Sequence, residues 1–202
     1  FHLTLFERKC VMEKKLKMLV VEDNENNIRA AEAMLAEHDV TIVSGYDQAR
    51  EEILDDFDIL LTDVMLPKGG YEMMGDEGRQ LVKSQGEMPY GAYILLLALD
   101  KSRNKTIKKI GMITAGNHHN DPFVFALDGV EGFEIGDVKV AITNNCNLYV
   151  STKNFSTIIN VKKLDWDEMK KMISAGEIVE VKDWSRLLKG LTHDTSISDN
   201  LE

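Results

Sequence analysis

The sequence predicts an α/β fold: a doubly wound, mainly parallel sheet of five strands, with an inserted loop and a small extra β/α segment. Over the first half of the chain, short apolar segments alternate with amphipathic helical segments, and the connections between them are short. This alternation is typical of a parallel sheet, because two parallel strands must be joined by a crossover long enough to hold a helix. Two of the apolar segments also end in acidic residues, at the strand ends where open α/β sheets place their binding sites.

The composition is that of an ordinary globular protein and argues against several classes. The chain has 202 residues, of which 44% are hydrophobic and 29% are charged. Its formal net charge of −10 argues against a general surface for nucleic acid or for an anionic membrane. No apolar stretch reaches the roughly 18 residues of a membrane-spanning helix. Cys10 and Cys146 show neither a disulfide framework nor zinc spacing, so we expect free thiols in a reducing compartment and a cytoplasmic protein.

Three strands and two helices are predicted in the first half of the chain. Asp23 or Asn24 is expected to cap the first helix and Asp47 the second, because short side-chain oxygens accept hydrogen bonds from the free N–H groups of a first turn. Apolar residues at helical spacing follow both positions. The three strands are predicted at Met18–Glu22, Val40–Val43 and Asp58–Thr62.

In the middle of the chain, the alternation of apolar strands and amphipathic helices is interrupted. The glycine-rich segment 69–88 is predicted to be an inserted loop with a short helix at 77–84. Tyr93–Leu99 is apolar enough for a buried strand, yet its leucine and alanine content and the upstream Pro89 favour a helix that starts near the proline. With that helix in place, the fourth strand is predicted at Ile110–Thr114.

The second half of the chain contains a second predicted insertion, at 130–177, between a helix that opens at Asp121 and a fifth strand at Ile178–Val181. Asp183 is expected to cap a terminal helix. Within the insertion, the predicted elements are strands at Val138–Thr143, Leu148–Val150 and Thr157–Val161 and a helix at Trp166–Ala175, capped by Asp165. The predicted plan is an N-terminal extension at 1–16, one domain at 17–191 and a flexible tail at 192–202.

Glu22, Asp23 and Asp63 are the candidate site residues with the clearest pattern. If the first and third strands are adjacent and parallel, these carboxylates converge at one edge of the sheet. Packed like charges are costly unless they are protonated or bound to a cation, and Mg²⁺ prefers such oxygen ligands. The plainer interpretation, that the acids only cap helices and solvate strand ends, would suffice for Asp23 alone. Three acids at matched strand ends favour a metal site.

Residues 18–67 resemble the receiver domain of two-component response regulators. The acidic pair that follows the family's first strand matches Glu22 and Asp23, and the family's phosphoacceptor motif matches Leu61–Pro67 around Asp63. The resemblance implies a flavodoxin-like sheet in the order 2-1-3-4-5. It also implies Mg²⁺ held by Glu22, Asp23 and Asp63, and transfer of a phosphoryl group to Asp63 from a sensor histidine kinase or a phosphotransfer protein.

Two further positions of the receiver pattern can be found. A Thr or Ser, usually followed by Ala, ends the family's fourth strand, and Thr114 fits this position. A Lys, usually followed by Pro, ends the fifth strand. Lys182 is the candidate and is expected to pair with Asp63 or its phosphate, although Asp183 replaces the proline. Lys139 is a weaker alternative for the same role.

The resulting expectation is a phosphoacceptor signalling protein, not an enzyme, in which Asp63 is phosphorylated and a downstream protein partner reads the result by direct contact. A pseudo-receiver, an interaction module without phosphotransfer, stays open, because the Lys-Pro pair is missing and a long loop follows Pro67. A Mg²⁺-dependent phosphohydrolase is a third possibility. It would normally need a second acid two residues after Asp63, where Met65 stands.

Overall fold

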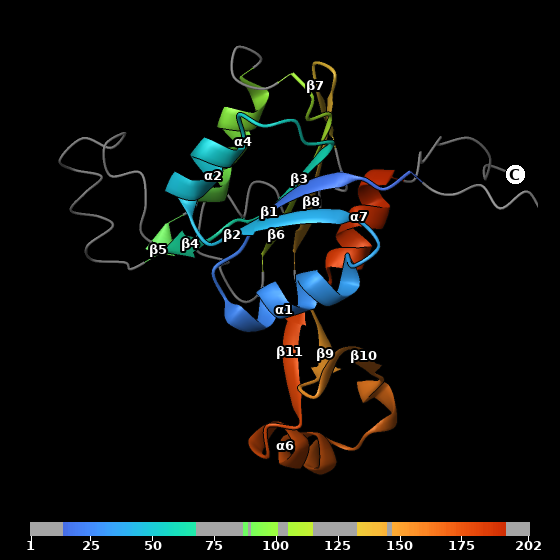
Figure 1. The fold of residues 1–202 in the computed structure, drawn as a ribbon. Coiled ribbons are helices and arrows are strands. Elements are labelled where there is room, and N and C mark those ends of the chain that lie inside the picture. Colours follow the sequence, from blue (N-terminus) through green and yellow to red (C-terminus); the bar gives the residue numbers. More distant parts are fainter. Residues whose placement is uncertain are drawn as a thin grey trace, which may run out of the picture.

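A six-stranded sheet forms the centre of the computed structural model, which describes residues 14–67, 87–88, 90–100, 105–114, 133–144 and 147–192. The strand order is β2-β1-β3-β6-β8-β7, and every neighbouring pair is parallel except β7 with β8 (Figure 1). In chain order the strands are β1 (Lys17–Val21), β2 (Asp39–Val43), β3 (Ile59–Asp63), β6 (Lys109–Thr114), β7 (Phe133–Ile135) and β8 (Val138–Asn144). Leu66–Pro67 (β4) and Glu87–Met88 (β5) form a separate, short antiparallel pair.

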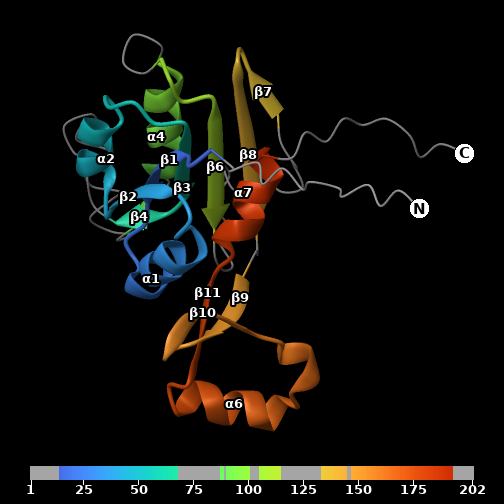
Figure 2. The ribbon, with the colours of Figure 1, turned by 45° about the vertical axis from the view of Figure 1, so that its right-hand side comes forward.

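Helices cover both faces of this sheet. Buried side chains of α2 (Tyr46–Glu52) and α4 (Tyr90–Leu99) share one apolar core with Leu19 of β1. Those of α1 (Glu25–Met34) and α7 (Trp184–Thr192) share a second core with its neighbour, Met18. In Figure 2, α2 and α4 accordingly lie on one side of the sheet and α7 on the other. Because both faces are covered, the central strands are continuous apolar runs with no alternation of polar residues.

The apolar segment before Asp100 is a helix, as predicted. α4 spans Tyr90–Leu99, and six of its ten residues are buried. Gly91 is required where this helix meets the end of β3, because a Cβ at that position would lie 2.2 Å from the backbone oxygen of Asp63. Its N–H donates to the backbone oxygen of Val64 at 3.1 Å. The first turn of α4 therefore packs directly against the residues that follow β3.

The helix caps agree with prediction except at α2. The Asn24 side chain caps α1 by accepting from the N–H groups of Asn26 and Asn27. The prediction that Asp47 caps the second helix is wrong, because Gly45 holds that position and Asp47 lies in the first turn. Packing explains the earlier start: Tyr46 is fully buried, with its ring 5.7 Å from that of Tyr90. The caps predicted later in the chain hold, with Asp165 accepting from the Glu168 N–H and Asp183 from the Arg186 N–H.

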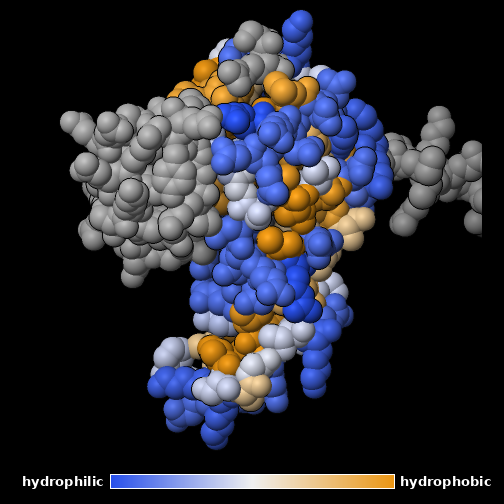
Figure 3. Space-filling model, turned by 60° about the vertical axis from the view of Figure 1, so that its left-hand side comes forward, coloured by the Kyte–Doolittle hydropathy of each residue, from blue (hydrophilic) through white to orange (hydrophobic). Residues whose placement is uncertain are grey.

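Residues 147–182, which we call the arm, form a second sheet, which is antiparallel, together with a helix and a 3₁₀ turn. Its strand order is β10-β9-β11, and Figure 1 shows it projecting from the main sheet beyond α1. α6 packs at its far end and has no buried residue, and Trp166 of this helix is 62% exposed. Figure 3 shows apolar side chains at the surface of this end among polar ones. The elements of the arm are β9 (Asn147–Ser151), β10 (Asn154–Ile159), a 3₁₀ turn at Val161–Lys163, α6 (Trp166–Ser174) and β11 (Ile178–Lys182).

The predicted place of the fifth strand is wrong. β11 pairs with β9 in the arm, whereas the place beside β6 belongs to β8, which was predicted to lie in an insertion. Burial gives the physical reason. β8 contributes side chains to both cores, Val140 to one and Ala141 to the other, as a parallel central strand does. β11 alternates between buried Val181 and exposed Glu180, as an antiparallel strand with one open face does.

The strands of the main sheet, numbered along the chain, lie in the order 2-1-3-4-6-5 and not in the five-strand order expected. Five α-helices accompany them within the described ranges. The helices predicted at 77–84 and from Asp121 lie outside those ranges, as do residues 1–13 and 193–202. Thr192, predicted to begin the tail, ends α7. No helix in the described part of the chain is long and apolar enough to cross a membrane.

Candidate functional site

The candidate site begins with two acids at the ends of neighbouring strands. β1 and β3 are adjacent and parallel, as predicted, and Val21 lies opposite Thr62. The next residues, Glu22 and Asp63, therefore end the two strands at the same level. Both are deeply buried, with 0% of Glu22 and 7% of Asp63 exposed. Two carboxylates in this position need positive charge or protons nearby.

Lys182 supplies the positive charge. Its Nζ lies 2.6 Å from Oε2 of Glu22 and 2.6 Å from Oδ2 of Asp63, and only 2% of the residue is exposed. The predicted ion pair with Asp63 is thus confirmed, although Lys182 comes from the arm and not from the main sheet. Lys139, the alternative, lies opposite Lys109 near the amino end of β8 and is not part of this cluster.

Asn27 is a site residue that the sequence did not reveal. Its side-chain N–H group donates to Oε1 of Glu22 at 3.3 Å, and its side-chain oxygen accepts from the backbone N–H of Lys182 at 3.1 Å. Its backbone oxygen accepts from the indole N–H of Trp184 at 3.1 Å. The available signal was its spacing, since Asn27 precedes Ala30 and Ala31 on the buried face of α1. A polar residue at the start of an apolar helix face suggests a buried partner.

Burial dominates the electrostatics of Asp63. Loss of water around the carboxylate, with a smaller contribution from the negative charge of Glu22, raises the pKa of Asp63 to about 7 against the opposing effect of Lys182. The backbone N–H of Met65 also donates to Oδ1 of Asp63 at 3.3 Å and lowers this pKa slightly. Near neutral pH, Asp63 is therefore present in both its protonated and its ionised form.

The three acids suit a hard divalent cation. One carboxylate oxygen from each of Glu22, Asp23 and Asp63 lies within 4.8 Å of the others. Oxygens bound directly to one Mg²⁺ at about 2.1 Å lie at most about 4.2 Å apart, and Mg²⁺ usually keeps several waters. Glu22 already accepts hydrogen bonds or an ion pair at both oxygens, from Asn24, Asn27 and Lys182. Asp63 likewise accepts at both oxygens, from the Met65 N–H and from Lys182, so a cation in this cluster would compete with these partners at both acids.

Thr114 ends the strand next to β3, at the same edge of the sheet as Asp63. Ile113 of β6 lies opposite Asp63, so Thr114 is one residue beyond it at the same edge of the sheet. The residue is 1% exposed, and within the described ranges its Oγ1 has no hydrogen-bond partner. A buried hydroxyl without a partner costs about 1–3 kcal/mol. Such a group is available to a ligand oxygen that enters the cluster.

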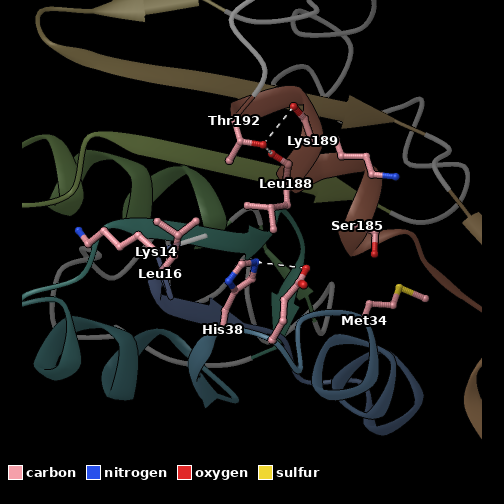
Figure 4. A pocket seen from close by; sticks show the side chains of 9 residues that line it. Lys14, Leu16, Met34, His38, Ser185, Leu188, Lys189 and Thr192 are labelled. Atoms are coloured by element: carbon pink, nitrogen blue, oxygen red, sulfur yellow. Dashed lines mark hydrogen bonds and ion pairs between the residues drawn. The ribbon is translucent and has the colours of Figure 1, made fainter. Parts of the chain in front are cut away.

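A separate cavity of about 590 Å³ lies at the opposite edge of the sheet, near the ends of α1 and α7. In Figure 4, Leu188 points into it from α7 and His38 from the turn before β2. None of the site residues Glu22, Asp23, Asp63, Thr114 and Lys182 lines this cavity, so it does not belong to the candidate site. Its lining residues are Lys14, Leu16, Met34, Glu37, His38, Ser185, Leu188, Lys189 and Thr192.

No protein-family model matches the chain, and searches of curated proteins and of solved structures find no significant match. Function must therefore be argued from the cluster itself. It combines a buried carboxylate that titrates near neutrality, two further acids and a buried ammonium group, and at the same sheet edge lies a hydroxyl that has no partner among the described residues. These groups can bind a divalent cation and a tetrahedral oxyanion together, because the cation, the ammonium and the hydroxyl all favour anionic oxygens.

Proposed function

We propose that this protein is a phosphoacceptor signalling domain in which Asp63 takes a phosphoryl group with the help of Mg²⁺. The observation that carries the proposal is the ion pair between Asp63 and Lys182 within a cluster of three acids. The receiver pattern predicts that Lys182 pairs with Asp63, and Nζ of Lys182 lies 2.6 Å from Oδ2 of Asp63. The buried hydroxyl of Thr114, which has no hydrogen-bond partner in the part of the chain that the structure describes, adds support.

The sheet also supports the receiver interpretation. If β7 is set aside as an added antiparallel edge strand, the parallel strands are β2-β1-β3-β6-β8. Numbered along the chain, these follow the receiver order 2-1-3-4-5, and in such sheets a site lies at the carboxyl ends of the central strands. We therefore include a flavodoxin-like domain, with the arm inserted between the fifth strand and the last helix, in the proposal.

The proposed reaction uses the carboxylate of Asp63 as nucleophile. One of its oxygens attacks the phosphorus of the donor, and a new O–P bond forms while the bond from phosphorus to the leaving nitrogen or oxygen breaks. The leaving atom keeps the electron pair and takes up a proton. Lys182 would pair with the phosphoryl oxygens, and the Thr114 hydroxyl would donate to one of them. Mg²⁺ held by Glu22, Asp23 and Asp63 would neutralise charge on the phosphoryl group.

This chemistry indicates which proteins would donate the phosphoryl group and which would respond to it. The donor would be a sensor histidine kinase or a phosphotransfer protein, whose phosphohistidine carries a transferable phosphoryl group. The product adds about −1.5 to −2 in charge at Asp63. Such a change can bias two packings of the surrounding elements, which a downstream protein partner would recognise by direct contact.

Intact mass measurement tests the proposal directly. The protein is incubated with Mg²⁺ and acetyl phosphate, and we expect the mass to rise by one phosphoryl group. Asp63→Asn should abolish the increase, whereas Asp56→Asn, at an exposed position before β3, should leave it unchanged. Beryllofluoride with Mg²⁺ should also raise the melting temperature of the wild type but not of Asp63→Asn. An equal response of the wild type and Asp63→Asn in both assays would refute phosphorylation at this residue.

A pseudo-receiver is the second candidate, and one observation favours it. Lys182 already pairs with both Glu22 and Asp63 in a nearly closed cluster, so the acids can serve as a structural lock without any phosphotransfer. In that case neither acetyl phosphate nor beryllofluoride would change the mass or the melting temperature. The protein would still bind its partner, and Asp63→Asn would leave that binding intact.

A further inference from the structure

We infer that Lys182 is a latch that holds the arm against the main sheet, and that a divalent cation in the acid cluster loosens this latch. The inference deepens the proposed function, since it rests on the cation site formed by Glu22, Asp23 and Asp63, but it does not require phosphorylation. It concerns how the arm, a separate sheet, is tied to the site.

Lys182 belongs to the arm by its backbone and to the site by its side chain. It is the last residue of β11, whose strand partner is β9, and it lies opposite Asn147. Its Nζ reaches the ends of two strands of the main sheet, at Glu22 and Asp63. A single side chain therefore joins the carboxylates of the main sheet to the hydrogen-bonded frame of the arm.

The arm also contacts the main body through apolar side chains, and the fully buried Val150 of β9 belongs to the core that holds α1 and α7. Phe155 of β10 lies beneath the guanidinium group of Arg29, at 4.3 Å from its ring centre. Phe155 and Val181 also join the apolar core that includes Ala30. Farther out, α6 contributes no buried residue. The ion pairs of Lys182 therefore act together with these apolar contacts in docking the near end of the arm.

A divalent cation weakens these ion pairs for two reasons. It is attracted to the same carboxylates, and its charge repels the ammonium group of Lys182 across a poorly solvated space. The effect must be reciprocal: if Lys182 lowers the affinity of the cluster for the cation, the cation lowers the attraction of the cluster for Lys182 by the same factor. Couplings of this kind typically amount to about a 5- to 150-fold change in affinity.

Calorimetric titration with Mg²⁺ tests one side of this linkage. We expect Lys182→Met to bind Mg²⁺ about 5- to 150-fold more tightly than the wild type. Lys162→Met is the matched control, because it removes an equal charge from an exposed position of the arm, and it should bind like the wild type. Equal affinities of Lys182→Met and Lys162→Met, or no Mg²⁺ binding by any of the three proteins, would overturn the inference.

Hydrogen exchange tests the other side on the unaltered protein, which avoids any folding defect of Lys182→Met. Saturating Mg²⁺ should speed amide exchange in β9 and β11 and leave exchange in β6 unchanged. Trp184 offers a second readout, because its ring centre lies 6.0 Å from Nζ of Lys182. In Trp166→Phe it is the sole tryptophan, and its fluorescence should change on adding Mg²⁺. Unchanged or slower exchange in the arm contradicts the latch.

The result is separable from the phosphoacceptor test. A phosphorylated Asp63 together with an arm that ignores Mg²⁺ would refute the latch and leave the proposed function standing. Faster amide exchange in the arm with Mg²⁺, together with no mass increase with acetyl phosphate, would refute the proposed function and leave the latch standing.

Discussion

The main sheet and the arm are both built from strands of about five residues, but they are stabilised in different ways. In the main sheet, helices cover both faces, and α4 alone buries six of its ten residues. In the arm, one sheet face packs towards α1, whereas α6 buries none of its nine residues. The main sheet is therefore held by apolar burial on both faces, whereas the arm is held by the buried residues Val150, Phe155 and Val181 and by the ion pairs of Lys182. The site lies where the two regions meet.

The largest change in the free energy of unfolding is expected from Lys182→Met, at the point where the two regions meet. Removing one partner of a buried ion pair leaves uncompensated charge, which costs about 3–5 kcal/mol. Urea denaturation should show this loss in the free energy of unfolding. The double variant Lys182→Met with Glu22→Gln should recover part of the loss, because one buried charge is then removed as well. A loss below about 1 kcal/mol, typical of surface pairs, would show that this pair is not a buried one in solution.

The next largest effects are expected from shortening apolar side chains, which should lower the free energy of unfolding strongly in the main sheet and hardly at all at an exposed position of the arm. Leu60→Ala in β3 removes a fully buried side chain from the main core and should cost about 2–5 kcal/mol in the free energy of unfolding. Ile158→Ala in β10 removes a side chain that is 61% exposed and should change it by at most about 0.5 kcal/mol. Both are measured by urea denaturation. Similar losses for the two variants would mean that Ile158 is covered in solution.

The pH dependence of stability should reveal the raised pKa of Asp63. Between its ordinary value of 3.8 and about 7, the folded protein holds a proton on Asp63 that the unfolded chain has released. This contribution is therefore present at low pH and is lost as the pH rises through 7. Relative to the wild type, Asp63→Asn should gain stability between about pH 4 and about pH 7, by up to about 1.4 kcal/mol for each pH unit, and the difference should level off above pH 7. A constant difference across this range would contradict the raised pKa.

The smallest effect is expected where the arm meets α1. Arg29→Gln removes the cation–π contact with Phe155 and should weaken arm docking by about 0.5–1 kcal/mol. Amide exchange in β10 should rise a few-fold, while exchange in β1 and β3 stays as in the wild type. Lys170→Gln, which removes the similar contact with Trp166 inside the arm, is the control and should not alter docking. Uniform changes over the whole chain would show that the arm and the main sheet unfold as one unit.

Much of the main sheet and its acids could be predicted because the signals are local. An apolar run that ends in an acid is visible in contiguous residues, and Glu22 and Asp63 lie where that pattern places them. The helix at α4 followed from the same kind of evidence, its leucine and alanine content. The place of the fifth strand could not be predicted locally, because Ile178–Lys182 ends in a lysine as the receiver pattern requires, whereas only tertiary packing shows that Val138–Asn144 contributes residues to both cores.

By itself, the sequence determined the early strands of the α/β domain, the acids at their ends and the identity of the lysine that pairs with Asp63. Only the tertiary structure decided that this lysine arrives from a separate sheet and that Asn27 fastens it to α1. The physical reason is distance along the chain. The hydrogen bonds from Lys182 to Asn27 and Glu22 join residues 155 and 160 positions apart, and no local propensity selects such partners. Packing of the arm on α1 brings them together.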